Sequence, residues 1–272
     1  MNQLEKILSF LQSFKMIKPT NYSWFHIVCL IITILITIIL IYKKPNKKKT
    51  MLIISIIMVL FETYKQLSFS YSNGTWNYQW YGFPFQFCAT PMYVALIAGL
   101  TKNKKIEECC YSFLATFGLI AGVSVMLYPN TVFVEEVLIN IQTMQHHGFM
   151  VVMGTYILAT HTVNRKYKEV IKEGFSVFLI FVAFALILDI VTYYLNIDGG
   201  LKMFFISPFH TSELPVFNII YEKVPYIIFL LLYLFAFFLG GSIMYEFAKL
   251  IKNNIHRRPK WKKETYMMKT KN

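Results

Sequence analysis

GFPFQFCATPM, residues 82–92, places a cysteine between two prolines in an uncharged, aromatic stretch. Cys88 follows Tyr81, the end of an aromatic loop, by about seven residues, which at about 1.5 Å per helical residue puts its sulfur roughly 10 Å below a membrane edge. Pro84 and Pro91 leave backbone carbonyls unpaired, which a membrane segment tolerates where neighbouring helices or a wet cavity satisfy them. The stretch therefore predicts the wall of a site, although a lone cysteine is also an ordinary small core residue.

Apolar runs of membrane-crossing length surround this stretch. The chain has 272 residues, 56% of them hydrophobic and 17% aromatic, and a mean hydropathy of +0.48, well above that of a soluble domain. Seven runs approach or exceed the roughly 20 residues that cross a bilayer core. They are Trp24 to Tyr42, Met51 to Tyr71, Gly82 to Leu100, Ile106 to Tyr128, Val137 to Val163, Gly174 to Leu195 and Val224 to Leu250. We therefore predict an all-α bundle of seven transmembrane helices that fills residues 24–250 as one domain.

Two short segments flank the predicted bundle. In residues 1–23, apolar side chains from Leu4 to Phe14 recur at three- and four-residue spacing, which predicts a short amphipathic helix in the membrane interface. Residues 251–272 are rich in Lys and Arg and are predicted to form a basic cytoplasmic tail. The role of the outer segment 196–223 stays open at this stage.

The net charge of +13 is explained by where the charges lie. Most of the 27 Lys and Arg residues fall in the loops after the first, third and fifth runs and in the C-terminal segment. Because cytoplasmic loops carry an excess of these residues, we predict an external N-terminus and a cytoplasmic C-terminus. The basic face is expected to attract anionic lipid, and no nucleic-acid partner is expected.

Charged and polar side chains inside the second run share one helical face. Glu62, Lys65 and Gln66 stand at i, i+3 and i+4. Since an isolated charge at mid-membrane costs about 2.5 to 3.5 kcal/mol, Glu62 and Lys65 are expected to pair with each other or across the bundle. A purely structural ion pair is the alternative to a functional one.

The fifth run holds the richest polar cluster of the chain. Gln142 and His146 share one face of this helix, and His147 falls on the adjacent face. Asp189 stands in the sixth run, and His26 lies at the outer boundary of the first, where a hydrated anchor is the alternative to a site residue. Counted from the outer helix ends, the buried polar groups lie at a similar depth, which predicts one polar chamber. Its predicted members are Glu62, Lys65, Cys88, His146 and Asp189.

A thiol beside an imidazole is the arrangement by which a cysteine becomes a nucleophile. Asp189 or Glu62 is expected to orient the imidazole, and Lys65 or Gln66 is expected to steady a developing oxyanion. In a chamber that opens toward the outer leaflet, the available carbonyl is a lipid ester. No metal is expected, since adjacent histidines on a helix diverge by about 100° and do not chelate one ion.

Short motifs carry a resemblance to a known family. FPFQFC before and including Cys88, YPN ahead of the fifth run, and HHG within it resemble the YwaF-like, or transmembrane protein 164, family of integral membrane proteins. Animal members of that family are regarded as cysteine-dependent acyltransferases acting on phospholipids. The resemblance implies Cys88 as the acyl-accepting nucleophile and His147 as its base, with His146 as the second candidate. It also favours a multi-pass protein of a bacterial cell membrane, without a cofactor.

Two functions of different classes follow from these residues. The first is acyl transfer from a phospholipid to a lysophospholipid through a thioester on Cys88. The second is a proton-coupled transporter or small-molecule binding protein that uses Glu62, Lys65, His146 and Asp189 as a relay. The acyltransferase predicts that substitution of Cys88 causes the largest loss of activity. The transporter or binding protein predicts that substitution of Glu62 or Asp189 causes it.

Overall fold

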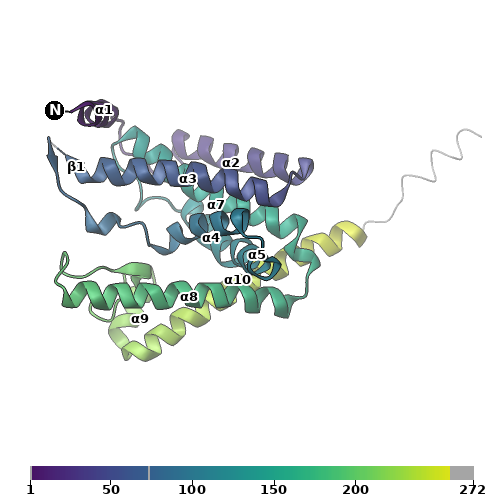
Figure 1. Cartoon of the computed structure of the whole chain (residues 1–272). Helices are drawn as coiled ribbons and strands as arrows, with labels where there is room; N and C mark the ends of the chain where they lie inside the picture. The colour runs from purple at the N-terminus through teal and green to yellow at the C-terminus, as the bar shows by residue number, and fades with distance from the viewer. Residues whose placement is uncertain (1, 73, 258–272) are drawn as a thin grey trace, which may run out of the picture.

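The computed structural model describes residues 2–72 and 74–257, and most of these residues lie in α-helices (Figure 1). The helices are α1 (Gln3–Gln12), α2 (Trp24–Lys43), α3 (Lys47–Ser70), α4 (Thr90–Leu100), α5 (Lys104–Phe113), α6 (Leu119–Leu127), α7 (Val137–Thr160), α8 (Tyr167–Tyr194), α9 (Phe217–Lys223) and α10 (Tyr226–Arg257). A small antiparallel hairpin of β1 (Tyr71–Ser72) and β2 (Thr75–Trp76) follows α3. The prediction of an all-α membrane fold is confirmed at this level.

Five helices of the described chain are long and apolar enough to cross a membrane. They are α2, α3, the continuous helix Lys104–Leu127, α8, and α10 as far as Asn254. A π-helical turn, Leu114–Gly118, joins α5 to α6 within the third of them. The helix α7 has 24 residues but is not among the five, because polar side chains interrupt its apolar sequence. Its side chains are mostly buried inside the bundle.

The predicted continuous helix from Gly82 to Leu100 is wrong. Two 3₁₀ turns, Trp80–Gly82 and Phe87–Ala89, precede α4, which has only 11 residues. Pro84 lacks an amide hydrogen and forces the residue before it into an extended conformation, and Phe83 has ψ 130°. Pro91 lies in the first turn of α4, where proline is tolerated. Cys88 therefore stands in an irregular segment instead of within a long helix.

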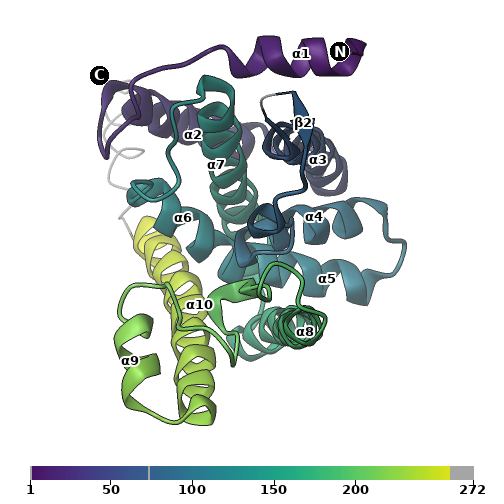
Figure 2. The same cartoon turned by 90° about the vertical axis from the view of Figure 1, so that its left-hand side faces the viewer.

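The helices form two groups with α4 and α5 between them. The helices α2, α3 and α7 lie side by side in one group, and α8, α9 and α10 lie in the other, as both views show (Figures 1 and 2). The central helix α7 packs against α2, α3 and α6. The irregular segment before α4 lies beside the polar helix α7, and His146 of α7 contacts Cys88 in that segment.

The N-terminal helix α1 lies across one end of the bundle (Figure 2). The Asn2 side chain caps it, and Glu5 completes a capping box. Leu8 is buried, whereas Ile7 and Phe10 are exposed. The predicted short helix is therefore present at residues 3–12, and its place in the membrane interface stays a prediction.

The C-terminal end differs from the predicted boundary. The helix α10 continues to Arg257, so residues 251–257 extend the last helix instead of starting a separate tail. The rest of the predicted basic tail, residues 258–272, lies outside the described residues.

Candidate functional site

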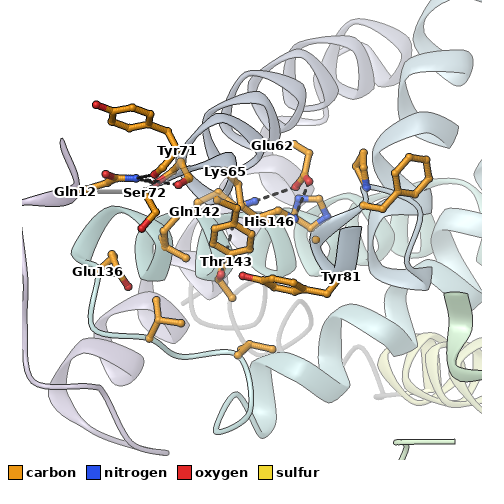
Figure 3. Close-up of a pocket in the computed structure, with 18 of the residues that line it drawn as sticks. Gln12, Glu62, Lys65, Tyr71, Ser72, Tyr81, Glu136, Gln142, Thr143 and His146 are labelled. Carbon is orange, nitrogen blue, oxygen red and sulfur yellow. Dashed lines mark hydrogen bonds and ion pairs between the residues drawn. The ribbon is translucent and has the colours of Figure 1, made fainter. Parts of the chain in front are cut away.

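A polar cavity of about 830 Å³ lies between α1, α3, α7 and the segment before α4. Gln12 and Glu136 line its end near α1, and Cys88, His146 and His147 line its deeper part. In Figure 3 the side chains of Glu62, Lys65 and His146 lie together at one end of this space, away from Gln12 and Glu136. The cavity therefore brings most of the predicted site residues into one place.

The wall that carries Cys88 is held by side chains because its backbone is irregular. Side chains of other helices donate hydrogen bonds to its carbonyls: Gln66 Nε2 to Gly82 at 2.6 Å, the Tyr93 hydroxyl to Pro84 at 2.6 Å, and His146 Nε2 to Cys88 at 2.9 Å. A buried carbonyl without a partner costs about 1 to 3 kcal/mol, so each contact matters for this conformation. Non-helical backbone at membrane depth is tolerated under these conditions, where it is enclosed by protein or lines a polar cavity.

Gln86 fixes the same segment to the second group of helices. Its side-chain oxygen accepts a hydrogen bond from the Phe204 amide at 3.0 Å, and its amide group donates to the Lys202 carbonyl at 3.2 Å. The rings of Phe85 and Phe87 both contact Phe204. The outer segment after α8 thus folds back onto the site wall, which gives the predicted outer loop a structural role.

The two adjacent histidines differ in which nitrogen is used. Since a carbonyl only accepts, His146 carries its proton on Nε2 and donates it to Cys88, and its buried Nδ1 has no partner in the described chain. His147 carries its proton on Nδ1 and donates it to the Thr143 carbonyl at 2.8 Å. Its Nε2 makes no hydrogen bond to any described residue, and the ring lines the cavity. The neutral His147 therefore presents a basic nitrogen with a fixed tautomer.

Glu62 of α3 is the centre of a hydrogen-bonded network in the same cavity. Its side chain is 5% exposed and accepts from Lys65 at 2.7 Å, Gln66 at 2.8 Å and Gln142 at 3.2 Å. The predicted pairing of Glu62 with Lys65 is confirmed. Gln66 also donates to Gly82 and accepts from Tyr78, so its amide is fully used and is not free to steady an oxyanion. Lys65 keeps donor hydrogens beyond its one ion pair.

Cys88 lines the cavity and also borders the apolar core. Within the described chain its thiol makes no hydrogen bond to His146 or His147, and the contact with His146 runs through the backbone carbonyl. Cys88, His146 and His147 thus line one cavity, with no hydrogen bond between the thiol and either imidazole in the described chain. Catalytic hydrogen bonds are often long before substrate binds.

Asp189 does not join the chamber, contrary to the depth argument. It is fully buried, and its carboxylate accepts a hydrogen bond from the Met203 amide at 2.6 Å, outside the residues that line the cavity. Thr192 on the same helix accepts from the Leu201 amide at 3.0 Å. Equal depth was a poor guide, because helices on opposite sides of a bundle reach the same depth without meeting. Asp189 instead fixes the loop that follows α8.

His26 is likewise outside the cavity and has a structural role. Its Nδ1 accepts from the Tyr22 amide at 2.9 Å, and its Nε2 donates to the Met126 carbonyl at 2.8 Å. Both ring nitrogens are used and the side chain is fully buried. His26 therefore connects the start of α2 to the end of α6, and it is neither a hydrated anchor nor a site residue.

Several residues at the site were missed by the sequence reasoning. Gln86 and Tyr93 hold the wall, and Gln12 of α1 donates to the carbonyls of Ser68 at 2.8 Å and Tyr71 at 2.7 Å. Their partners are backbone carbonyls, which carry no sequence signal. The one hint was the position of Gln12 on the polar side of the amphipathic segment.

A second, almost wholly apolar cavity of about 630 Å³ lies on the opposite face of α7, against α2. Gln145 lines it, and both polar atoms of its amide are buried without a partner in the described chain. Within residues 2–72 and 74–257, no group of three or more His, Cys, Asp or Glu side chains is placed to hold a metal ion. The polar cavity, whose lining includes Cys88 and His147, is therefore the candidate functional site.

These features define a multi-pass integral membrane protein with a polar cavity enclosed by its helices. The chain matches the TMEM164 family over residues 17–245, most of its length, and it belongs to that family. No curated protein and no solved structure matches the chain. The match covers α2 to α9, most of α10, and the cavity residues outside the N-terminal segment, and the resemblance drawn from the sequence motifs is confirmed.

Proposed function

We propose that this protein is a membrane acyltransferase that moves an acyl chain between a phospholipid and a lysophospholipid through a thioester on Cys88. One observation carries the proposal: Cys88 and His147 line the same cavity, and His147 Nε2 is free to accept a proton. The class of reaction comes from chemistry, since a thiol with a nearby neutral imidazole can be activated to attack a carbonyl.

In the first half-reaction, His147 Nε2 takes the proton from the Cys88 thiol as substrate binds, directly or through one water. The thiolate attacks the ester carbonyl of a phospholipid and forms a tetrahedral intermediate. The intermediate collapses with cleavage of the ester C–O bond, and the leaving alkoxide takes the proton from the imidazolium. The products are a lysophospholipid and an acyl thioester on Cys88.

In the second half-reaction, His147 takes the proton from the hydroxyl of a second lysophospholipid. The resulting oxygen nucleophile attacks the thioester, the C–S bond breaks, and the Cys88 thiolate recovers the proton. Lys65 is the candidate for stabilising the oxyanion in both steps, because its ammonium lines the cavity and keeps free donors beside Glu62. Glu62 holds Lys65 in place and His146 holds the backbone of Cys88.

The proposal includes the membrane topology. The five apolar helices, together with α7 and the segment ending in α4, form seven crossings, with the N-terminus outside and the lysine-rich loops in the cytoplasm. The polar helix α7 is tolerated because its polar side chains face neighbouring helices and the cavity instead of lipid. The cavity then opens near the outer leaflet, where the donor and acceptor lipids lie.

The test is acylation of the purified full chain by a phospholipid with a labelled acyl chain. We expect a hydroxylamine-sensitive label on the wild type and on the control variant Cys29→Ala, which changes a cysteine outside this cavity. The label should be absent from Cys88→Ala. Equal labelling of Cys88→Ala and wild type would refute the thioester.

A proton-coupled transporter or small-molecule binding protein is the competing proposal. The Glu62–Lys65 pair at the cavity wall favours it, whereas Asp189 bonds to the Met203 amide away from the cavity. This alternative predicts that Glu62→Gln abolishes uptake or ligand binding while Cys88→Ala is neutral. The acyltransferase predicts the reverse order for transfer activity.

A further inference from the structure

A third cavity lies at the end of the bundle where the lysines of several loops gather. It has a volume of about 410 Å³ and lies between the α2–α3 connection, the start of α5 and the end of α7. Its lining includes four lysines and one carboxylate: Lys44, Lys47, Lys48, Lys104 and Glu107. It is separate from the cavity with Cys88, and none of its lining residues belongs to that site.

The charges in this cavity do not balance. Glu107 is 6% exposed and pairs with Lys104 at 3.2 Å and Lys48 at 4.0 Å. Lys44 and Lys47 form no ion pair with any side chain of the described chain. The cavity therefore keeps a surplus of positive charge after its own carboxylate is satisfied, which favours an anionic ligand.

Two helices begin at this cavity and add to its positive potential. The helix α3 starts at Lys47 and α5 starts at Lys104, with Asn46 and Asn103 as their caps. The caps accept from Lys49, Lys105 and Ile106, whereas the first amide of each helix has no partner within its own helix. Helix N-termini with free amides favour phosphate and other anions.

A buried hydroxyl without a well-formed hydrogen bond gives an independent indication of a ligand. Tyr111 is 1% exposed and lines the cavity, and within the described chain its hydroxyl has only a contact with Glu107 that falls outside the normal distance and angle of a hydrogen bond. The His161 ring packs edge-on against Tyr111, and its Nε2 is bound by Glu108 at 2.7 Å. Buried hydroxyls normally have a partner, so this position is prepared for a polar atom from outside the chain.

From these observations we infer that this cavity binds a phosphate group, carried by the headgroup of an anionic phospholipid. Lys44 and Lys47 supply the uncompensated charge, the starts of α3 and α5 supply backbone donors, and the Tyr111 hydroxyl donates to a phosphate oxygen. The cavity lies at the ends of membrane-crossing helices, within reach of lipid headgroups. This inference does not depend on the acyltransferase proposal, since it concerns a different cavity.

The experiment titrates phosphatidic acid, phosphatidylcholine and inorganic phosphate into the detergent-solubilised full chain and measures bound ligand by native mass spectrometry. Lys44→Gln with Lys47→Gln removes two charges from the cavity. Lys43→Gln with Lys49→Gln removes two charges from neighbouring exposed positions outside it. Tyr111→Phe removes only the hydroxyl, and it should fold normally because within the described chain that hydroxyl has only a poorly aligned contact with Glu107 to lose.

We expect the wild type and the Lys43/Lys49 variant to bind phosphatidic acid alike and to bind phosphatidylcholine weakly. The Lys44/Lys47 variant and Tyr111→Phe should each bind phosphatidic acid about tenfold more weakly. Binding of inorganic phosphate with the same variant pattern would support the phosphate site and assign it to a soluble ligand. An equal loss in both lysine variants, or unchanged binding by Tyr111→Phe, would overturn the inference.

Discussion

His146 and His147, which are adjacent on α7, use different ring nitrogens for their hydrogen bonds. His146 uses Nε2 to hold the Cys88 carbonyl, whereas His147 uses Nδ1 to hold its own helix and leaves Nε2 free. The side-chain nitrogen of glutamine resembles Nε2 in position, and that of asparagine resembles Nδ1. Each histidine can therefore be replaced by an amide that keeps its hydrogen bond and loses its basicity.

Substitution of each histidine by its matching amide should separate structure from catalysis. We expect His147→Asn to keep the thermal stability of the wild type and to lower the acyl-transfer rate about 10²- to 10⁴-fold, because the base is lost. His146→Gln should keep both, whereas His146→Ala should lower the stability by about 1 to 3 kcal/mol, because it leaves the Cys88 carbonyl unpaired. Transfer rates and melting in detergent would be measured for all three. An inactive His146→Gln with an active His147→Asn would reverse the assignment.

At the scale of elements, the position of α7 depends on close approach to its neighbours. A side chain at Gly122 of α6 would place its Cβ 2.7 Å from Met150 Cβ and 3.1 Å from the His147 carbonyl. Such distances leave no room for a methyl group. Gly122 thus permits the close contact between α6 and α7 that fixes α7, and with it the histidines.

Gly122→Val should therefore destabilise the bundle by about 1 to 3 kcal/mol through overpacking against α7. Ser124→Val is the control, because Ser124 lies on the exposed side of the same helix and bonds only to its own backbone at Ile120. Thermal unfolding of the purified variants in detergent would be compared. A Gly122→Val protein as stable as Ser124→Val would show that α6 and α7 have room to move apart.

At the scale of the whole molecule, α1 closes the end of the cavity. Gln12 bonds to the end of α3, and the strand-like segment after α1 pairs with the chain before α7 through Met16 and Glu135 at 2.9 Å. Lys15 and Glu136 form an ion pair at the same place. Contacts with the end of α3 and with the chain just before α7 thus hold α1 over the cavity.

The ion pair predicts a defined dependence of stability on pH. The hydrogen bond from Lys15 holds the pKa of Glu136 below its usual value of 4.5. A lowered folded-state pKa adds stability above the ordinary value, and this stability is lost as the pH falls through the lowered pKa. Since both side chains are partly exposed, the contribution at neutral pH is at most about 1 kcal/mol.

We expect the wild type to be slightly more stable than Glu136→Gln at pH 7, the difference to shrink as the pH falls below about 4.5, and the difference to vanish once the pH is below the lowered pKa of Glu136. Glu135→Gln, which changes an adjacent exposed carboxylate without an ion pair in the described chain, should show no such difference. Unfolding would be followed in detergent across this range. A difference that grows on acidification would contradict the assigned sign.

Much of the fold could be predicted from the sequence because burial in lipid demands long apolar helices. The runs that became α2, α3, the helix Lys104–Leu127, α8 and α10 were all predicted, although α8 starts earlier, at Tyr167, and α10 ends later, at Arg257, than expected. The Glu62–Lys65 pair was also predictable, since i and i+3 positions meet on any helix. These features depend only on local spacing.

The failures at Asp189 and His26 concern contacts with residues that are not their neighbours in the sequence. Asp189 and Glu62 lie at comparable depths, yet Asp189 bonds to the loop after α8 and Glu62 faces the cavity. His26 has the sequence position of an interface anchor, but the end of α6 takes up its Nε2. The count of residues along a helix gives the depth of a side chain in the membrane. It does not give the side chain's neighbours, because the lateral position of each helix is set by packing.

The sequence by itself determined a helical membrane protein, the apolar runs that cross the bilayer, and the candidate residues Cys88, His146 and His147. Only the tertiary structure decided that Cys88 stands in an irregular segment, and which nitrogen of each histidine is free. The physical reason is that hydropathy and helical spacing are local properties of the chain. The partners of backbone carbonyls depend on which helices pack side by side.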